Sequence, residues 1–540
     1  MNTRHTPKQS FAELCDLGTE LLSRVIAIES QSDAASATIP STEGQRRLSE
    51  YLAAYFSGLG FPVTSDASAN LLAEVPGNLA HQAPKLAFMV HMDTAEGTRA
   101  IPALVTLEAW DGGRIPYPEN DRLEVSVARY PQTAAFLGQD LLFGPGQRAM
   151  GLDDKLGMAE MMLLAKILAT NPDIPRPDMV LVARPDEEIG RMAAVEGLAD
   201  EFVRRGVKYG YTVDGLDPFE INTENFYAAG ARVTIVGAPL DLPQAAVARV
   251  VTLLVEGAKS HGATAKAEGY FNATSAFVQA LAHGDALSGR GAAIPIGFAT
   301  DATAETSAVL RFLLRADDGA GLDRLEADLL ARFAEVLAPH AYKGAQVALT
   351  GRDPVPGDTL ATDELLQLHA HLQAFLAATG PAPVPLLSEE SDGYQGYSNP
   401  HAVRPAGPGQ IELSYRIRDF TSENLAVRKA HIQAVAEASR ASVEIYDQYT
   451  NMGPALAAYP ELVAWAEDAA RSADVSARRA PIRGGTGVDP FLTKGIPIAN
   501  LGTGYFAPES EKEFTSRQIL ARTALWLTHL VQVVAAVERA

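Results

Sequence analysis

Two adjacent carboxylates, Asp153 and Asp154, stand between Gly151 and Gly157 in a short stretch with apolar neighbours. Adjacent carboxylates repel each other, and apolar flanks remove them from water, so the pair is stable mainly when a metal ion or another cation neutralises it. The alternative is a helix cap, in which one Asp side chain accepts backbone N–H groups ahead of the helical pattern that begins at Met158. Taken alone, the stretch favours the helix cap.

Further metal-binding side chains follow three apolar runs of strand length, and a helical pattern at 158–169 lies between the first two. This alternation predicts an α/β domain with a mostly parallel central sheet. In such sheets ligands bind beyond the carboxyl ends of the strands, so the side chains at these ends should meet at one edge. The runs and the residues that follow them are 85–90 with His91 and Asp93, 179–183 with Glu187 and Glu188, and 209–213 with Asp214.

These residue types together suit a hydrolytic site with two zinc ions, which needs carboxylates, an imidazole, a bridging group and a base for water. His91 offers a nitrogen, and Asp93, two residues further on the same strand face, can orient it through a hydrogen bond. Asp153 could bridge two metals. One residue of the pair at 187 and 188 can bind metal while the other acts as the general base. Each residue alone has a more common structural role, but the combination favours a metal site.

The composition sets limits on the class of protein. The chain has 540 residues and 47% apolar content, which predicts two or more domains. Its net charge of −21 argues against nucleic acid and anionic membranes as partners. The single cysteine, Cys15, excludes an intrachain disulfide framework and a Cys-rich zinc site, which favours the cytoplasm. The first ten residues lack a signal-peptide core, and we expect a soluble protein without membrane spans.

A change in sequence pattern, to more β-branched runs and long amphipathic helices with fewer acidic residues at strand ends, predicts an inserted second domain. We expect residues 1–223 and 452–540 to form the catalytic domain and residues 224–451 to form an α+β lid. Within the lid, a strand, helix, strand order at 307–315, 322–337 and 346–349 recurs at 410–419, 423–439 and 442–446. This recurrence indicates a duplicated lid with two ferredoxin-like halves, and a chance match is the alternative because the two copies are not closely identical.

The motifs in this order resemble the M20 family of zinc exopeptidases, and most of all its peptidase T branch. The resemblance covers roughly residues 11–230 and 405–540. It rests on His91-Met92-Asp93-Thr94, Gly151-Leu152-Asp153-Asp154-Lys155, Asp186-Glu187-Glu188-Ile189-Gly190 and Thr212-Val213-Asp214-Gly215. Further support comes from Pro40-Ser41-Thr42-Glu43-Gly44-Gln45, Glu224-Asn225-Phe226, Arg416-Ile417-Arg418-Asp419-Phe420 and Pro481-Ile482-Arg483-Gly484-Gly485-Thr486.

The resemblance implies a role for each matching residue. Residues His91, Asp153, Glu188 and Asp214 resemble the family's metal ligands, with Asp153 bridging, Asp93 behind His91 and a peptide bond between Asp153 and Asp154 that is often cis. Glu187 resembles the general base. Arg418 resembles the lid residue that holds a substrate carboxylate, a task suited to a guanidinium. The resemblance also implies two zinc ions per chain, with cobalt or manganese as alternatives.

Three departures from the family pattern leave questions open. The family's last metal ligand is a His, and Glu509 stands in its place, which puts the second metal in doubt. Gly487 stands where relatives of the peptidase T branch usually carry an acid. The lid His that stabilises the oxyanion is matched by His261, while a second alignment places Asp241 there. The enlarged lid resembles monomeric M20 dipeptidases, so a monomer and a homodimer are both open.

The sequence therefore predicts a cytoplasmic, metal-dependent exopeptidase that hydrolyses short peptides through a metal-activated water, either as an aminopeptidase or as a dipeptidase. An amidohydrolase acting on N-acyl amino acids is the nearest enzymatic alternative on this scaffold. A catalytically impaired, peptide-binding relative is the alternative from another class, and the replaced His at 509 motivates it.

Overall fold

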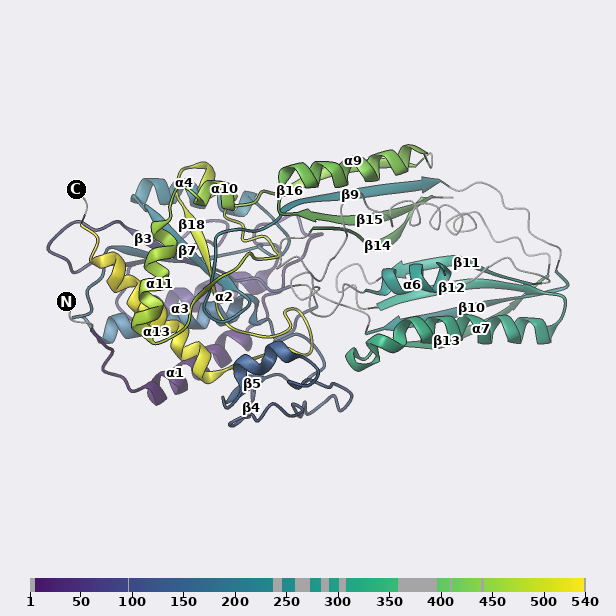
Figure 1. Cartoon of the computed structure of the whole chain (residues 1–540), viewed down its shortest axis with the longest axis horizontal. Coiled ribbons are helices and arrows are strands. Elements are labelled where there is room, and N and C mark those ends of the chain that lie inside the picture. The colour runs from purple at the N-terminus through teal and green to yellow at the C-terminus, as the bar shows by residue number, and fades with distance from the viewer. Residues whose placement is uncertain are drawn as a thin grey trace. The chain divides into compact units, whose positions relative to one another are not determined.

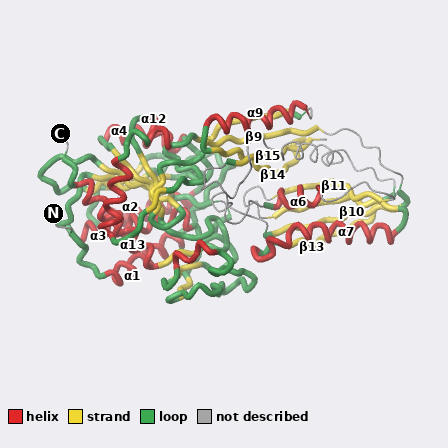
Figure 2. The backbone as a smooth tube through the Cα atoms, viewed as in Figure 1, coloured by secondary structure: helices red, strands yellow, loops and turns green. Residues whose placement is uncertain are grey.

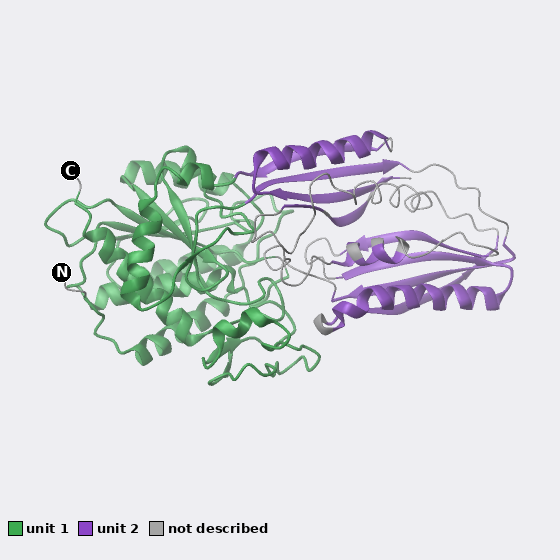
Figure 3. Cartoon of the chain, in the orientation of Figure 1, with its two compact units in different colours: residues 1–225, 451–540 green, residues 226–450 purple. Residues whose placement is uncertain are grey.

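The computed structural model describes residues 5–538, apart from 96, 237–244, 258–271, 283–290, 301–306, 358–395, 408–409 and 439–440. The chain divides into two compact units (Figure 3). Unit 1 comprises Met1–Asn225 and Asn451–Ala540, and unit 2 comprises Phe226–Thr450. Unit 2 is therefore inserted into the chain of unit 1.

Unit 1 is a mixed α/β domain in which helices alternate with short strands (Figure 1). Its first part contains α1 (Phe11–Ile26), α2 (Glu43–Gly58), β1 (Val63–Ser65), β2 (Leu71–Val75), β3 (Leu86–His91), β4 (Val105–Leu107), the 3₁₀ helix η1 (Pro131–Phe136), β5 (Leu141–Phe143), α3 (Leu152–Thr170), β6 (Met179–Arg184), α4 (Ala193–Arg205), β7 (Tyr209–Gly215) and β8 (Glu220–Asn222). Its second part contains α10 (Gly453–Leu456), α11 (Glu461–Ala473), β17 (Arg478–Arg479), α12 (Asp489–Thr493), β18 (Ile498–Gly502), β19 (Phe514–Ser516) and α13 (Arg517–Ala535).

The central sheet of unit 1 has eight strands in the order β1-β2-β6-β3-β7-β18-β8-β17. At its centre β3 runs parallel to β6 and β7, and β7 runs parallel to β18. Every residue of β3 and β6 is buried, which explains why both strands are continuous apolar runs rather than alternating ones. The prediction of an α/β domain is confirmed. The parallel strands include β3, β6 and β7, whose ends carry the candidate site residues.

Helix α3 covers this sheet and contacts both β3 and β7, while α1 and α13 pack against α3. The close approach of α3 to β7 depends on Gly157, because a Cβ there would lie 1.8 Å from the carbonyl oxygen of Val213. A glycine therefore brings the first turn of α3 against the end of β7. A separate three-stranded sheet, in the order β19-β5-β4, ties the segment after β3 to the loop that precedes α13.

Unit 2 consists of two four-stranded antiparallel sheets, each with a helix along it (Figure 2). One sheet has the order β11-β12-β10-β13 with α7, and the other has the order β14-β15-β9-β16 with α9. The elements are β9 (Tyr227–Val236), β10 (Val247–Glu256), α6 (Ala273–Ala282), β11 (Gly291–Thr300), β12 (Ser307–Ala316), α7 (Gly319–Leu337), the 3₁₀ helix η2 (Ala338–Lys343), β13 (Gln346–Val355), β14 (Tyr397–Gly407), β15 (Gln410–Asp419), α9 (Ser422–Ala438) and β16 (Ser442–Tyr449).

The two halves of unit 2 are equivalent strand by strand. In each, the strand before the helix lies second in the sheet and the strand after the helix lies at an edge. The duplicated order of strand, helix and strand that the sequence predicts is therefore confirmed. Apolar residues of both halves form one hydrophobic core, which includes Val233 and Leu413 from one half and Leu253 and Phe312 from the other.

Within the described part of the chain, the helices are too short or too polar to cross a lipid bilayer.

Candidate active site

His91, the last residue of β3, is buried and is held by contacts on both ring nitrogens. Its Nδ1 atom lies 2.8 Å from the backbone carbonyl oxygen of Asp93. Because a carbonyl oxygen only accepts hydrogen bonds, this contact places a proton on Nδ1. Nε2 points toward carboxylates, 2.9 Å from Asp153 Oδ1 and 3.4 Å from Asp214 Oδ1. The ring is thus oriented with the nitrogen that could bind metal facing the cluster.

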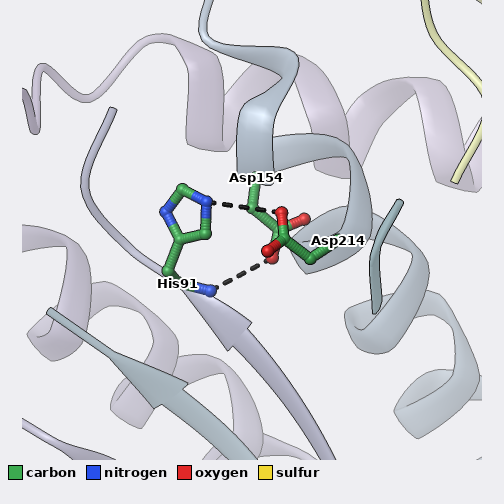
Figure 4. A group of neighbouring side chains, drawn as sticks. All are labelled: His91, Asp154 and Asp214. Carbon is green, nitrogen blue, oxygen red and sulfur yellow. Dashed lines mark hydrogen bonds and ion pairs between the residues drawn. The ribbon is translucent and has the colours of Figure 1, made fainter. Parts of the chain in front are cut away.

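The two Asp residues at the start of α3 do not cap the helix. Both have non-helical backbone angles, and the peptide bond between them is cis, as the resemblance implied. Asp154 accepts a hydrogen bond from the backbone N–H of His91 over 3.1 Å (Figure 4). Asp153 contacts the His91 ring and forms further side-chain hydrogen bonds with Asp214 and Tyr505. The helix-cap interpretation is therefore wrong, because both carboxylates turn toward β3.

Asp93 is fully buried and holds the loop that carries the two glutamates. Its Oδ1 accepts the backbone N–H of Glu187 over 2.9 Å, and its Oδ2 accepts that of Glu188 over 3.0 Å. The same residue contacts His91 through its carbonyl group. One carboxylate thus fixes the positions of two neighbouring residues relative to the imidazole.

Two groups of metal-binding side chains share His91. In the first, ligand atoms of His91, Asp154 and Asp214 lie within 4.8 Å of one another (Figure 4). In the second, the same holds for His91, Asp153 and Glu188. Both groups combine an imidazole nitrogen with carboxylate oxygens, a donor set that suits zinc and similar divalent cations. Among the described residues, the buried Oε1 atom of Glu188 has no hydrogen-bond partner, which leaves it available to a cation.

The pKa values of the cluster show how closely its carboxyl groups are crowded. Burial and the charge of Asp153 raise the pKa of Asp214 to about 8. Burial, followed by the charge of Asp214, raises the pKa of Asp154 well above its usual range. Burial and the charges of Asp153 and Glu509 do the same for Glu188. Carboxyl groups this crowded ionise readily only next to a cation, so the residues fit the metal that the sequence predicts.

The pKa of His91 is also raised, against the effect of burial. Burial alone would lower it, but the charge of Asp214 and the hydrogen bond with Asp153 outweigh burial and raise the pKa of His91 well above its usual value. At Asp153 burial would raise the pKa, but the hydrogen bond with His91, the charge of His91 and further hydrogen bonds together lower the pKa of that carboxyl.

Glu187 lies next to the cluster and not inside either group. Its side chain is 15% exposed, and its Oε1 lies 3.3 Å from Nη2 of Arg184. Burial raises the pKa of Glu187, and the charge of Arg184 is the largest effect that opposes the rise. A carboxylate that is partly exposed, adjacent to a ligand and close to His91 has the position expected of a general base.

The loop between β18 and β19 carries Glu509, which has a left-handed φ of 54°. Its charge acts on Glu188, but within the described residues neither metal-binding group includes Glu509. Glu513 holds this loop: its Oε1 accepts the Glu509 backbone N–H over 2.7 Å, and its Oε2 accepts the N–H groups of Met150 and Gly151 over 2.6 and 2.8 Å. Glu513 thus links the Glu509 loop to the turn before Asp153.

Sequence reasoning missed three residues of this site: Arg184, Tyr505 and Glu513. The sequence indicates Arg184 only weakly as a site residue, because it is a charged residue at the end of an apolar run. Glu513 is the third glutamate in the run that starts at Glu509, and the sequence alone does not show which of the three is buried. Tyr505, whose hydroxyl hydrogen-bonds Asp153, had no signal at all.

The remaining predicted residues belong to unit 2. Arg418 lies in β15 and is 9% exposed. Its Nη1 donates to the carbonyl oxygens of Ala229 and Ile417, both over 3.0 Å, and its guanidinium lies 5.4 Å from the ring centre of Tyr449. His261 and its alternative Asp241 lie outside the described residues.

Known proteins resemble the chain over almost its whole length, although no family model matches it. Peptidase T of Aeromonas hydrophila is 28% identical over 526 residues, which cover 95% of this chain and 97% of the relative. Peptidase T of Vibrio parahaemolyticus is 26% identical over 523 residues, with the same two coverages.

Solved structures share the fold. The aminoacylhistidine dipeptidase of Vibrio alginolyticus has a TM-score of 0.53 at 16% identity and covers 99% of both chains. A tripeptidase of Staphylococcus aureus has a TM-score of 0.51 at 15% identity, covering 96% of this chain and 98% of that structure.

A mixed sheet with a carboxylate and imidazole cluster at its edge, in a chain that carries a second unit as an insertion, suits a metal-dependent hydrolase. Together the relatives support an M20 metallopeptidase close to peptidase T. The resemblance inferred from the motifs is confirmed.

Proposed function

We propose that this metallopeptidase is an exopeptidase that removes residues from short peptides, with the hydrolytic centre at His91, Asp153, Glu188 and Asp214. One observation carries the proposal: Asp93 orients His91 and also holds Glu187 and Glu188 by their backbone N–H groups. A ligand and a general base are thereby fixed side by side. The names of the similar proteins, peptidase T and dipeptidase, agree with short peptides as substrates.

In this proposal the residues divide into ligands, base and anchors. Asp153 lies between the two metal-binding groups, since it contacts Asp214 and belongs to the group of Glu188, which suits a bridging ligand. A bound divalent metal would supply Lewis acidity and lower the pKa of a water molecule. Glu187 would act as the general base that accepts a proton from the attacking water and then passes it to the leaving amine.

The proposal also covers the number and identity of the bound metals. We propose two zinc ions per chain, with cobalt or manganese able to replace them, because the donors are one imidazole and several carboxylates. Glu509 would complete the second site with an oxygen ligand in place of the family's His.

The lid residues complete the proposal. Arg418 would hold the substrate carboxylate, and His261 would stabilise the oxyanion of the transition state. A monomer is favoured over a homodimer, because the duplicated unit 2 offers two equivalent halves within one chain. The cytoplasm is the proposed compartment, since the single cysteine, Cys15, is buried and unpaired.

A comparison of two adjacent glutamates tests the assignment. Glu187→Gln should retain bound metal but lose hydrolysis of Leu-Gly-Gly, whereas Glu188→Gln should lose metal first. Metal content is measured by elemental analysis after dialysis, and hydrolysis by release of free leucine. Equal metal loss in both variants would contradict the division into base and ligand.

A substrate panel separates the exopeptidase from its alternatives. Free dipeptides and tripeptides should be cleaved, whereas N-acetyl-Leu-Gly-Gly should be resistant if the free amino terminus is required. Preferential hydrolysis of N-acetyl amino acids would instead identify an amidohydrolase. Less than one tightly bound metal per chain, together with no hydrolysis after incubation with zinc, cobalt or manganese, would identify a catalytically impaired peptide-binding protein.

A further inference from the structure

A buried guanidinium lies beside the proposed general base. Arg184 is the last residue of β6, and its side chain is 4% exposed. Its Nη2 atom donates to the backbone carbonyl oxygen of Thr486 over 2.9 Å and to Glu187 Oε1 over 3.3 Å. Burying a cation is costly unless its partners compensate, so this position has a specific reason to carry an arginine. The five preceding residues of β6 are buried and include no charged side chain.

Gly487 provides the space that the guanidinium needs. A Cβ at residue 487 would lie 2.6 Å from both Nη1 and Nη2 of Arg184 and 2.9 Å from Cζ. The residue also has a φ of 58°, which favours glycine. Any other residue at 487 would have to displace the guanidinium. The carbonyl group of Thr486 and the bare backbone of Gly487 therefore form a seat for Arg184.

The seat points the guanidinium at Glu187 rather than at a metal ligand. Glu187 is held through its backbone by Asp93, but that contact leaves the side-chain torsions free. Arg184 supplies a hydrogen bond to the carboxylate itself, from the same Nη2 atom that also donates to the carbonyl oxygen of Thr486. The backbone and the side chain of Glu187 are thus fixed by two different residues.

We propose that Arg184 is a positioning residue that orients the Glu187 carboxylate for proton transfer, and that Thr486 and Gly487 are the seat of its guanidinium. The inference rests on the proposed role of Glu187 as general base. A purely structural Arg184, tying β6 to the loop at 486, is the competing explanation, and it predicts losses of stability and metal rather than of turnover.

The first test is the kinetics of Arg184→Leu, which removes the guanidinium but keeps an apolar stem. With Leu-Gly-Gly as substrate, kcat should fall at least about tenfold, in line with the cost of misplacing a catalytic group, while KM changes less than about threefold. Metal content after dialysis should equal that of the wild type. Arg184→Lys keeps a donor and a charge and should recover part of the loss, which also serves if the Leu variant folds poorly.

The second test changes Gly487, the residue that leaves room for the Arg184 guanidinium. Gly487→Ala should lower kcat by a similar factor, because the new Cβ displaces the guanidinium. A control in the same loop is Gly484→Ala, where a Cβ would meet no atom within 4 Å. In the double variant Arg184→Leu with Gly487→Ala, kcat should be no lower than in the Leu variant alone, since both changes act through one group.

A thermal measurement tests the seat without any assay of activity. The Tm loss caused by Gly487→Ala should be smaller in the Arg184→Leu background, because the clash with the guanidinium is gone and only the backbone strain at a φ of 58° remains. Equal Tm losses in both backgrounds, additive effects on kcat, or an Arg184→Leu enzyme with normal kcat would each overturn the inference. Wild-type enzyme that cleaves no peptide would instead refute the proposed function, while the Tm result would still stand on its own.

Discussion

The carboxylate of Glu513 accepts the backbone N–H of Glu509 over 2.7 Å, and this hydrogen bond ties the proposed last ligand to the turn before Asp153. The other oxygen of Glu513 accepts the N–H groups of the turn that leads into Asp153. Two loops far apart in the sequence, at 150–152 and at 509, therefore depend on one buried side chain. Because Glu509 adopts a left-handed backbone, it needs such an external support.

Replacing Glu513 should therefore disturb both loops at once. Glu513→Ala leaves several buried N–H groups without an acceptor and should lower the unfolding free energy by on the order of 3 kcal/mol, measured by urea denaturation. Glu513→Gln should lose less, because its carbonyl oxygen still accepts on one side while its NH2 group faces an N–H donor on the other. Glu511→Ala is the control, since Glu511 lies in the same run and is partly exposed. A Glu513→Ala protein as stable as the control would contradict this role.

Removal of the Glu509 side chain tests the substituted ligand. Glu509→Ala should lower the amount of zinc retained after dialysis, because the second site loses an oxygen donor, whereas Glu509→His should retain metal. Elemental analysis of both variants beside Glu511→Ala measures the difference. Zinc retention equal to the wild type in Glu509→Ala would show that the loop contributes no ligand.

Asp93 should be sensitive to the loss of one acceptor oxygen. Asp93→Asn offers a single carbonyl oxygen to the N–H groups of Glu187 and Glu188, and its amide turns a donor toward one of them. We expect turnover of Leu-Gly-Gly to fall about 10–100-fold, the usual cost of losing a residue behind a metal ligand. Steady-state kinetics with saturating zinc measure the effect. Turnover within twofold of the wild type would mean that the glutamate loop does not rely on Asp93.

Glu220 does not belong to the proposed metal cluster, and its titration should make the stability of the protein depend on pH. Burial and the charge of Asp217 raise its pKa from 4.5 to about 7, although Arg478 opposes the rise. The folded protein therefore binds more protons than the unfolded chain between pH 4.5 and 7, so the unfolding free energy falls as the pH rises through this window.

Glu220→Gln removes this titration. Relative to the wild type, the variant should gain stability between pH 5 and pH 8, by at most about 3 kcal/mol for a shift of this size. Urea denaturation at both pH values measures the change. If the difference between variant and wild type is the same at pH 5 and pH 8, Glu220 does not titrate in this window.

Much of the site could be read from the sequence, because parallel strands end at a common edge. His91, Glu187, Glu188 and Asp214 each follow a buried apolar run, and the structure places all four around one edge of the sheet. The duplicated order in unit 2 was likewise visible, since strand and helix periodicities are local properties. The role of the pair at 153 and 154 could not be decided from local pattern, which favoured a helix cap.

The sequence by itself determined which elements form and which side chains their ends present, because both follow from hydrophobic periodicity and residue type. Only the tertiary structure decided which side chains contact one another. Glu513 rather than Glu511 supports the ligand loop, and Arg184 reaches Glu187 because Gly487, some 300 residues away in the chain, leaves room for it. Such pairings depend on burial and on distances between residues remote in sequence, and no local pattern records them.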